Sequence, residues 1–224
     1  MSLPPHYVGR NRHGQYCVPQ SSAHRPVAQA ILAGKVWERR TIDCIAQHAG
    51  DGDVVHAGAY FGDFLPAVTK ALAPGATLWA FEPNPENYQC AAETVRMNEL
   101  ANCRLFNAAL GDEETSTVLV TEMANGYVLG GASYLESLTL PKYTGESAVV
   151  DMLTIDKLVG DRRVTVIHLD VEGAELMGLI GGQVCIRRDR PILLLESMVL
   201  PTSLRDVPYD VIEHWSGSWL LKPS

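Results

Sequence analysis

A glycine turn and a carboxylate on the following strand are the first groups in this sequence whose spacing fits a ligand. The apolar run "VVHA" leads into Gly58-Ala-Tyr-Phe-Gly62, and the next apolar run, "LWAF", ends at Glu82. A glycine-bearing turn between a strand and a helix typically binds a nucleotide-like ligand. An ionised carboxylate at the end of the next strand can accept hydrogen bonds from both hydroxyls of a ribose. The pair therefore indicates a nucleoside-containing ligand.

The glycine spacing separates two candidate ligands. A dinucleotide turn requires G-x-G-x-x-G, because the backbone must approach a pyrophosphate closely. Counted from Gly58, the later two glycine positions hold Tyr60 and Asp63, and the Asp63 carboxylate would place negative charge beside the pyrophosphate. The pattern therefore disfavours NAD. S-adenosylmethionine has no phosphate and tolerates side chains in the turn, so it is the ligand that these residues favour.

A second group of polar residues follows the apolar strand "VTVIHL". Asp170 ends this strand, His168 points to the same side by the two-residue period of a strand, and Glu172 lies on the next turn. A hydroxyl is a poor nucleophile unless a base accepts its proton as the new bond forms. We expect Asp170 to orient cofactor and substrate, and His168 or Glu172 to assist proton removal. The alternative for His168 is a purely structural role inside the strand.

A further carboxylate, Glu196, ends the run "PILLLE". Because neighbouring strands lie about 4.8 Å apart, Glu196 and Asp170 could converge on one site. Converging carboxylates share a proton or bind a hard cation such as Mg²⁺. Only two such oxygen ligands are visible in the sequence, so we expect a metal-independent site and assign no metal ligands.

Strands and helices alternate along the chain and would position these groups. Alternation of this kind predicts a doubly wound, mostly parallel sheet with both faces covered by helices, and the tail 209–223 suggests an antiparallel closing hairpin turned at Ser216-Gly217. The predicted strands cover 54–57, 76–82, 103–110, 116–122, 162–170 and 192–196. The predicted helices cover 62–73, 84–100 and 172–182.

Length and composition limit the class of protein. A chain of 224 residues suits one domain over 1–224, with an N-terminal extension over 1–35 and a cofactor-binding core over 36–224. The net charge of −8 weighs against a nucleic-acid partner. The five cysteines are scattered and never form C-x-x-C, which argues against a disulfide framework. The N-terminus has no apolar signal region and no run reaches a membrane span of about 18 residues, so we expect a cytoplasmic protein.

Three stretches together, "VVHAGAYFG", "FEPNPENY" and "IHLDVEGAELMGLIGG", resemble the FkbM family of S-adenosylmethionine-dependent methyltransferases. The resemblance covers roughly residues 34–197. It implies a seven-stranded, Rossmann-like class I methyltransferase fold with S-adenosyl-L-methionine as the cofactor. It also implies O-methylation of a small-molecule or glycan hydroxyl, on a sugar, a glycan or a polyketide-type natural product. We also consider a homodimer as the assembly of such a chain.

The same resemblance implies which residues bind the cofactor. Glu82 would hold the ribose, and the third strand would lie near the adenine ring. The implied cofactor-binding residues are Gly58, Ala59, Tyr60, Gly62, Glu82, Pro83, Asn84, Asn107, Ala108 and Asp170. This sequence departs from the family pattern at His56, where an acidic residue is usual, and at His168, where a lysine is usual.

Two alternative functions stay open on the sequence. One is an NAD-linked oxidoreductase, and the other is a module of the same fold that binds the cofactor without turnover, suggested by His56 and His168. The long Gly/Ser/Tyr-rich segment 123–145 is either a lid over the crevice or a disordered stretch. Within it, Tyr127, Tyr134 and Tyr143 are candidates to stack on a sugar or macrocycle.

Overall fold

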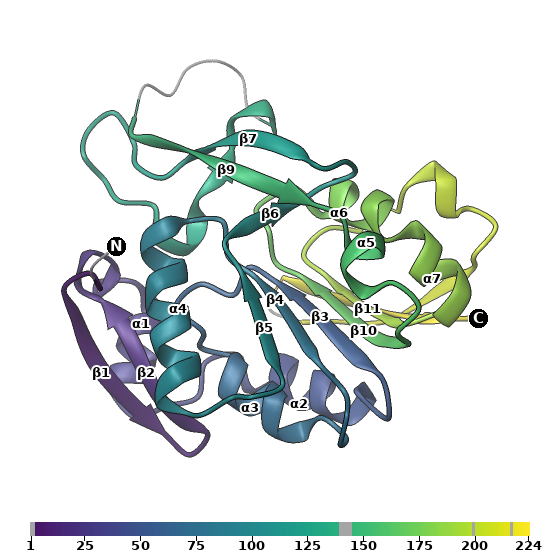
Figure 1. The fold of residues 1–224 in the computed structure, drawn as a ribbon, viewed down its shortest axis with the longest axis horizontal. Helices are drawn as coiled ribbons and strands as arrows, with labels where there is room; N and C mark the ends of the chain where they lie inside the picture. The colour runs from purple at the N-terminus through teal and green to yellow at the C-terminus, as the bar shows by residue number, and fades with distance from the viewer. Residues whose placement is uncertain (1–2, 139–144, 199, 216) are drawn as a thin grey trace.

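The structure is a computed structural model of the chain and describes residues 3–138, 145–198, 200–215 and 217–224. Its centre is a seven-stranded sheet in which five strands run parallel and a hairpin closes one edge antiparallel (Figure 1). This architecture confirms the predicted fold class. In sheet order the strands are β12 (Tyr209–Trp215), β13 (Ser218–Pro223), β11 (Ile192–Leu195), β10 (Val164–Leu169), β3 (Asp53–Ala57), β4 (Leu78–Phe81) and β5 (Cys103–Phe106).

The order of the strands locates the crevice in which a ligand would bind. From β3 the chain moves outward to β4 and β5, and it then returns to place β10 on the other side of β3. Ligands of open parallel sheets bind outside the carboxyl ends of the strands at such a reversal. The strand ends that meet here carry Gly58, Glu82 and Asp170, which are three of the residues singled out by the sequence.

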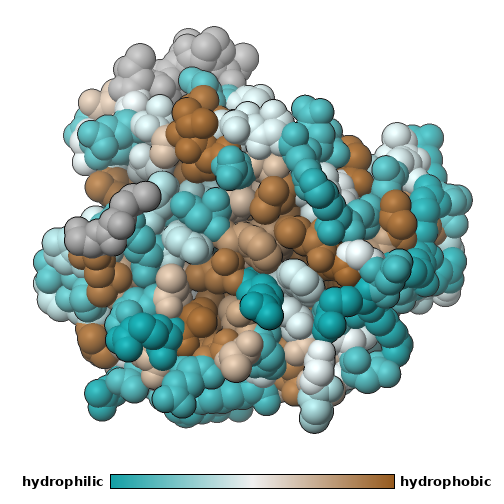
Figure 2. All heavy atoms as spheres, in the orientation of Figure 1, coloured by the Kyte–Doolittle hydropathy of each residue, from teal (hydrophilic) through white to brown (hydrophobic). Residues whose placement is uncertain are grey.

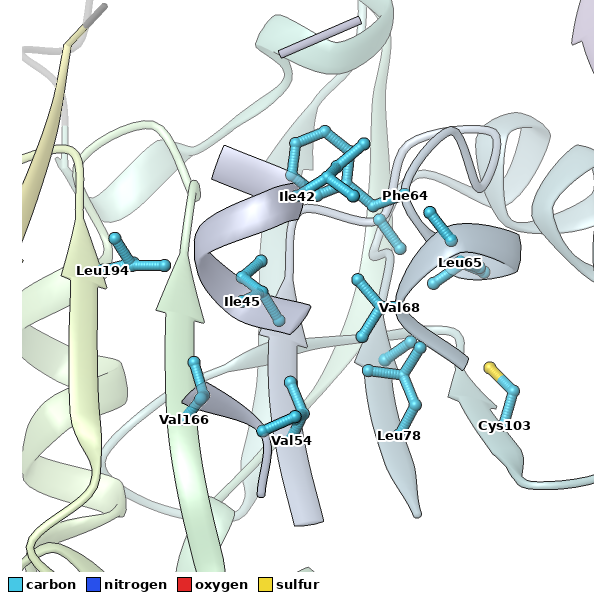
Figure 3. Packing of buried hydrophobic residues seen from close by; sticks show 14 of the residues in the cluster. Ile42, Ile45, Val54, Phe64, Leu65, Val68, Leu78, Cys103, Val166 and Leu194 are labelled. Atoms are coloured by element: carbon cyan, nitrogen blue, oxygen red, sulfur yellow. The ribbon is translucent and has the colours of Figure 1, made fainter. Parts of the chain in front are cut away.

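Helices cover both faces of this sheet. Successive side chains of a strand point to opposite faces, and in these buried strands the side chains on both faces are apolar, so both faces must be covered. One face packs Val54, Val166 and Leu194 against residues of α2 and α3, such as Ile45 and Val68 (Figure 3). The opposite face packs its own apolar cluster against the later helices. The helices of the first face are α2 (Arg39–His48), α3 (Leu65–Ala71) and α4 (Pro85–Met97), and those of the second are α5 (Ile155–Val159), α6 (Glu175–Gly181) and α7 (Gln183–Asp189).

The N-terminal segment forms a hairpin that packs on α4. The hairpin consists of β1 (His6–Asn11) and β2 (Gly14–Pro19), and α1 (Pro26–Leu32) follows it. Cys17 is fully buried, and its backbone N–H donates to the hydroxyl of Thr94 at 3.0 Å. β1 is largely exposed and carries no apolar pattern by which the sequence would predict it. The hairpin is thus tied to the helix that borders the crevice.

A second, four-stranded sheet stands beyond the carboxyl ends of β4 and β5 (Figure 1). It corrects the prediction of one continuous strand over 103–110. The chain leaves the main sheet at Asn107, whose side-chain amide donates to the backbone carbonyls of Glu82 and Pro83 at 2.9 and 3.0 Å. The following residues pair with β9 instead. In order, the strands of this sheet are β6 (Ala108–Leu110), β9 (Ser147–Leu153), β7 (Thr115–Val120) and β8 (Tyr134–Leu135).

Local signals account for several boundaries. Asn84 caps α4: its side-chain oxygen accepts from the backbone N–H groups of Glu86 and Asn87, at 3.0 and 3.3 Å. The turn predicted for the closing hairpin includes Ser216, which lies outside the described residues. On the face seen in Figure 2, hydrophobic residues gather toward the middle and hydrophilic residues toward the rim. No helix in the described ranges is both long enough and apolar enough for a membrane crossing.

Candidate active site

A cavity of about 260 Å³ opens at the carboxyl ends of β3, β4 and β10, where the sequence predicts the ligand. Residues from the N-terminal segment, the glycine turn and the loop before β8 complete its wall. Acidic groups dominate this wall, which suits a cationic ligand. Its carboxylates are Glu38, Asp63, Glu82, Asp170, Glu172 and Glu196, and its one basic side chain within the described part of the chain is Arg25.

The glycine turn holds three strand ends together. Gly58 has a φ of +87°, and a Cβ at this position would lie 1.9 Å from the backbone oxygen of Asp170. The backbone N–H groups of Gly58 and Ala59 both donate to the carbonyl of Phe81, at 3.1 and 2.9 Å. Gly62 also has a φ of +87°. The turn therefore needs glycine both for its backbone conformation and for the close approach of β10.

Glu82 is fixed by the same turn. Its carboxylate accepts from the backbone N–H of Tyr60 at 2.7 Å and from that of Asn84 at 2.9 Å. Burial raises the pKa of Glu82 to about 8, although these backbone hydrogen bonds oppose the shift. Each carboxylate oxygen can accept more than one hydrogen bond, so Glu82 keeps the capacity to accept from ribose hydroxyls.

An apolar slot continues from the main cavity beside Glu82. Phe81, Ala108 and Leu119 contribute to its wall, and Glu82 and Asp170 line both spaces. An apolar slot can contact an adenine ring, and a neighbouring carboxylate can accept from ribose hydroxyls, so the residues present are of the types that S-adenosylmethionine requires. Ala108 lies where an adenine contact was predicted, whereas Asn107 lies behind the wall and holds the carbonyls at the exit of β4.

The remaining predicted cofactor residues differ in position. Pro83 lines the slot, and Tyr60 lines the main cavity. Ala59 and Asn84 do not line either space: Ala59 is buried in the turn, and the side-chain amide of Asn84 donates to the hydroxyl of Ser133 at 3.0 Å. Their part in cofactor binding stays a prediction, and it would be structural support of the turn and of the α4 N-terminus.

The carboxyls of Asp170 and Glu196 interact directly, as the adjacency of β10 and β11 predicts. Burial, together with this neighbour, raises the pKa of Asp170 well above its ordinary range. Burial raises the pKa of Glu172 as well, and the charge of Glu196 adds to that shift. Two carboxyls that interact this closely, as Asp170 and Glu196 do, favour sharing one proton. In the described part of the chain, no three His, Cys, Asp or Glu side chains form a metal-binding group.

Two histidines lie side by side on neighbouring strands next to the cavity. His56 and His168 face each other on β3 and β10, with 2.8 Å between their Nδ1 atoms, and Phe64 stacks on both rings. Burial lowers the pKa of His168 to about 4 and that of His56 well below its usual value. Both rings are therefore neutral at pH 7, and one Nδ1–H donates to the other Nδ1.

Only His56 of this pair lines the cavity. His168 reaches the cavity only through His56, so its position gives no support to the hypothesis that it removes a proton from the substrate directly. His56 was noticed in the sequence only as a departure from the family pattern. His56 takes its place on the cavity wall through its register opposite His168 on the neighbouring strand. The sequence alone does not fix that register.

The loop between β7 and β9 contributes to the site together with the N-terminal segment. Arg25 donates to the backbone carbonyls of Val128 and Leu129, and its guanidinium lies 5.2 Å from the ring centre of Tyr127. Gly131 from this loop lines both spaces. Sequence reasoning missed Arg25, which belongs to the N-terminal segment without periodicity, and Glu38, which directly precedes α2. Tyr143, predicted to stack on a substrate, lies outside the described residues.

Comparison with known proteins decides the family. The sequence matches the FkbM methyltransferase domain over residues 56–213, which is more than half of the chain. The chain belongs to the FkbM methyltransferase family. It is a domain of the S-adenosylmethionine-dependent methyltransferase class, and its cofactor is S-adenosyl-L-methionine. The NAD interpretation is thereby set aside, in agreement with the missing glycines at Tyr60 and Asp63.

A solved structure of an FkbM methyltransferase shows the same fold at low sequence identity. The FkbM methyltransferase of Methylobacillus flagellatus KT is 18% identical, with a TM-score of 0.51, over 78% of this chain and 44% of that one. The tRNA (uracil-54, C5)-methyltransferase of Pyrococcus abyssi is 11% identical, with a TM-score of 0.49, over 97% and 44%. This FkbM domain thus spans less than half the length of either protein. No curated protein matches the chain.

Proposed function

We propose that this FkbM domain transfers the methyl group of S-adenosylmethionine to a hydroxyl of a sugar, a glycan or a polyketide-type product. The observation that supports this most is the cluster of Asp170, Glu172 and Glu196 on the cavity wall, next to the slot that fits adenosine. The cofactor supplies an electrophilic methyl group on a sulfonium, and the acceptor hydroxyl must lose its proton during transfer. Carboxyls whose pKa is raised toward neutrality suit that task.

In this proposal, the three carboxyls have different roles because they occupy different positions on the cavity wall. Asp170 lines both spaces and shares a proton with Glu196, so it can orient a hydroxyl and the cofactor at once. Glu172 also lines both spaces and is exposed, which gives its carboxylate access to the acceptor. In the proposed reaction the acceptor oxygen bonds to the methyl carbon, the carbon–sulfur bond breaks, and Glu172 accepts the hydroxyl proton.

The experiment separates cofactor binding from turnover. Formation of S-adenosylhomocysteine is measured with panels of sugars, oligosaccharides and hydroxylated macrolactones, and methylated products are located by mass spectrometry and NMR. Glu172→Gln should lower turnover about 100-fold or more and leave the affinity for S-adenosylhomocysteine within a few-fold. Asp170→Asn should lower turnover and also weaken cofactor binding.

Three outcomes would contradict the proposal. Unchanged turnover in Glu172→Gln would remove that residue from proton transfer. A methyl group found on nitrogen or carbon would exclude the hydroxyl acceptor. Tight cofactor binding with no methylated product from any panel would favour the module without turnover.

A further inference from the structure

A short segment between β7 and β8, residues 128–133, forms one side of the place where the two cavity spaces meet. We call it the wall segment. Its Gly131 lines both spaces, as Asp170 and Glu172 do, so it lies at the junction where cofactor and acceptor would come together. Those two carboxyls follow β10 of the main sheet, whereas Gly131 belongs to a loop. Contacts outside the main sheet must therefore hold it in place.

Two glycines let the wall segment pack closely against the glycine turn. A Cβ at Gly130, whose φ is +57°, would lie 2.7 Å from the hydroxyl oxygen of Ser22 and 3.2 Å from that of Tyr60. A Cβ at Gly131 would lie 3.5 Å from the nearest ring carbons of Tyr60. Because glycines gain the most freedom when a segment undocks, this packing needs further contacts to persist.

Two side chains from distant parts of the chain supply such contacts. Arg25, in the N-terminal segment, donates to the backbone carbonyls of Val128 and Leu129. Asn87, on the first turn of α4, donates from its side-chain Nδ2 to the backbone carbonyl of Gly130 at 3.1 Å. A loop that depends on a few hydrogen bonds opens more readily than the core strands, so these two anchors control its position.

Asn87 is also hydrogen-bonded to the carboxylate assigned to the ribose. Its Nδ2 donates to Oε1 of Glu82 at 3.4 Å, and its side chain is 1% exposed. This nitrogen carries two N–H groups, one for Glu82 and one for Gly130. Ribose hydroxyls that donate to Glu82 favour its ionised form, and an ionised carboxylate holds an N–H donor more strongly than a neutral one. The amide is then fixed with its second N–H directed at Gly130.

We propose that Asn87 couples the cofactor site to the wall segment, so that ribose binding at Glu82 fixes the acceptor side of the junction. Asn87 is a positioning residue, because it acts through Glu82 and Gly130. This role rests on the proposed function, which makes the wall segment the acceptor side. Arg25 anchors the same segment independently of the cofactor. The acceptor side is complete only after the cofactor has bound, so the cofactor binds first.

Hydrogen exchange of the 128–133 amides tests the coupling, with S-adenosylhomocysteine as the ligand at concentrations that saturate each variant by calorimetry. In wild type, the ligand should slow this exchange about 10-fold. Asn87→Ala should exchange faster without ligand and should lose most of the slowing with it. Arg25→Ala should also exchange faster without ligand but should keep the slowing. Arg96→Ala, whose side chain on α4 is 73% exposed, is the matched control and should behave as wild type.

Asn87 is buried, so Asn87→Ser serves as a second variant that keeps a polar group but is too short to bridge both acceptors. Exchange in β3 and β10 verifies the fold of each variant. Unchanged wild-type exchange on saturation would exclude the coupling. Full slowing in both Asn87 variants would exclude it as well, because the ligand would then act by direct contact with Gly131.

Two further outcomes overturn the coupling in different ways. If Arg25→Ala loses the slowing as completely as Asn87→Ala, the response belongs to the loop as a whole and Asn87 has no special role. If wild type does not bind S-adenosylhomocysteine, the coupling fails together with the cofactor assignment. Failure of the coupling alone leaves the proposed O-methylation intact, because no acceptor is present in these measurements.

Discussion

The most unusual residues of this molecule are buried carboxyls that have no basic partner among the described residues. Glu82 and Asp63 are 5% and 7% exposed, and burial raises their pKa values to about 8 and about 7. Surface carboxylates of the same chain pair with arginines instead, as Glu93 does with Arg96. The buried groups lower the stability of the free protein when they ionise, and a cationic ligand would offset that effect.

The first prediction concerns the pH dependence of stability. Carboxyls with raised pKa values bind more protons in the folded state than in the unfolded state, so the free energy of unfolding falls as pH rises. Between pH 6.5 and 8.5 the folded-state His56 and His168 stay neutral, and loss of the remaining protons from these histidines in the unfolded state offsets only part of the change. Asp63 and Glu82 therefore dominate. We expect the free protein to lose about 2 kcal/mol over this range, or roughly 4–8 °C in Tm.

Thermal unfolding at a series of pH values measures this effect. Saturating S-adenosylmethionine should raise Tm at every pH and should do so most above pH 7, where Asp63 and Glu82 ionise beside the bound cation. A Tm that stays level or rises from pH 6.5 to 8.5 in the free protein would contradict the assignment of these raised pKa values.

At the scale of elements, the strand–turn–helix units could be predicted because each signal is local. The apolar runs of β3 and β10, the glycines of the turn and the Asn84 cap are all visible within a few residues of sequence. The departure of the chain from the main sheet at Asn107 is not visible in this way, because "CRLFNAAL" reads as one continuous strand. That break depends on pairing with β9, more than 40 residues away along the chain.

Some residues of the candidate site could likewise be predicted from local sequence, and others could not. Glu82 and Asp170 could be found from the sequence, because each follows a predicted parallel strand. Arg25 reaches the cavity from a segment that lacks periodicity, and Glu38 reaches it from the residue before α2. The place of His56 depends on its partner across the sheet. Tertiary packing alone brings these side chains to the wall.

The second prediction belongs to the glycine turn. Gly58→Ala would introduce a Cβ 1.9 Å from the oxygen of Asp170 at a φ of +87°. We expect a loss of about 3 kcal/mol or more, because the strain of the left-handed backbone adds to a collision with β10. Gly75→Ala has nearly the same φ, +86°, but no atom lies within 4 Å of its Cβ. It should cost only about 1–2 kcal/mol.

Urea unfolding of the two variants makes the comparison. Equal losses in Gly58→Ala and Gly75→Ala would mean that backbone conformation alone requires the glycine, and that the close approach of β3 and β10 has no energetic importance.

At the scale of the whole molecule, the fold gathers groups from distant parts of the sequence onto one cavity. Gly58, Glu82 and Asp170 come from three parallel strands, Glu38 from the segment before α2, and Gly131 from the loop that precedes β8. The N-terminal hairpin is part of the same arrangement, since Cys17 binds Thr94 and Thr94 in turn donates to the carbonyl of Phe61 in the glycine turn. Changes in the hairpin should therefore reach the cofactor turn.

The central claim is that this crevice binds the adenosyl cofactor, with the Glu82 carboxylate on its ribose. Calorimetric titration with S-adenosylhomocysteine tests it most directly, comparing wild type, Glu82→Gln and the control Glu86→Gln on the first turn of α4. We predict clear binding by wild type and by the control, and an affinity at least about 10-fold weaker in Glu82→Gln, whose fold is verified by thermal unfolding. No binding by wild type, or equal affinity in Glu82→Gln, would contradict the account.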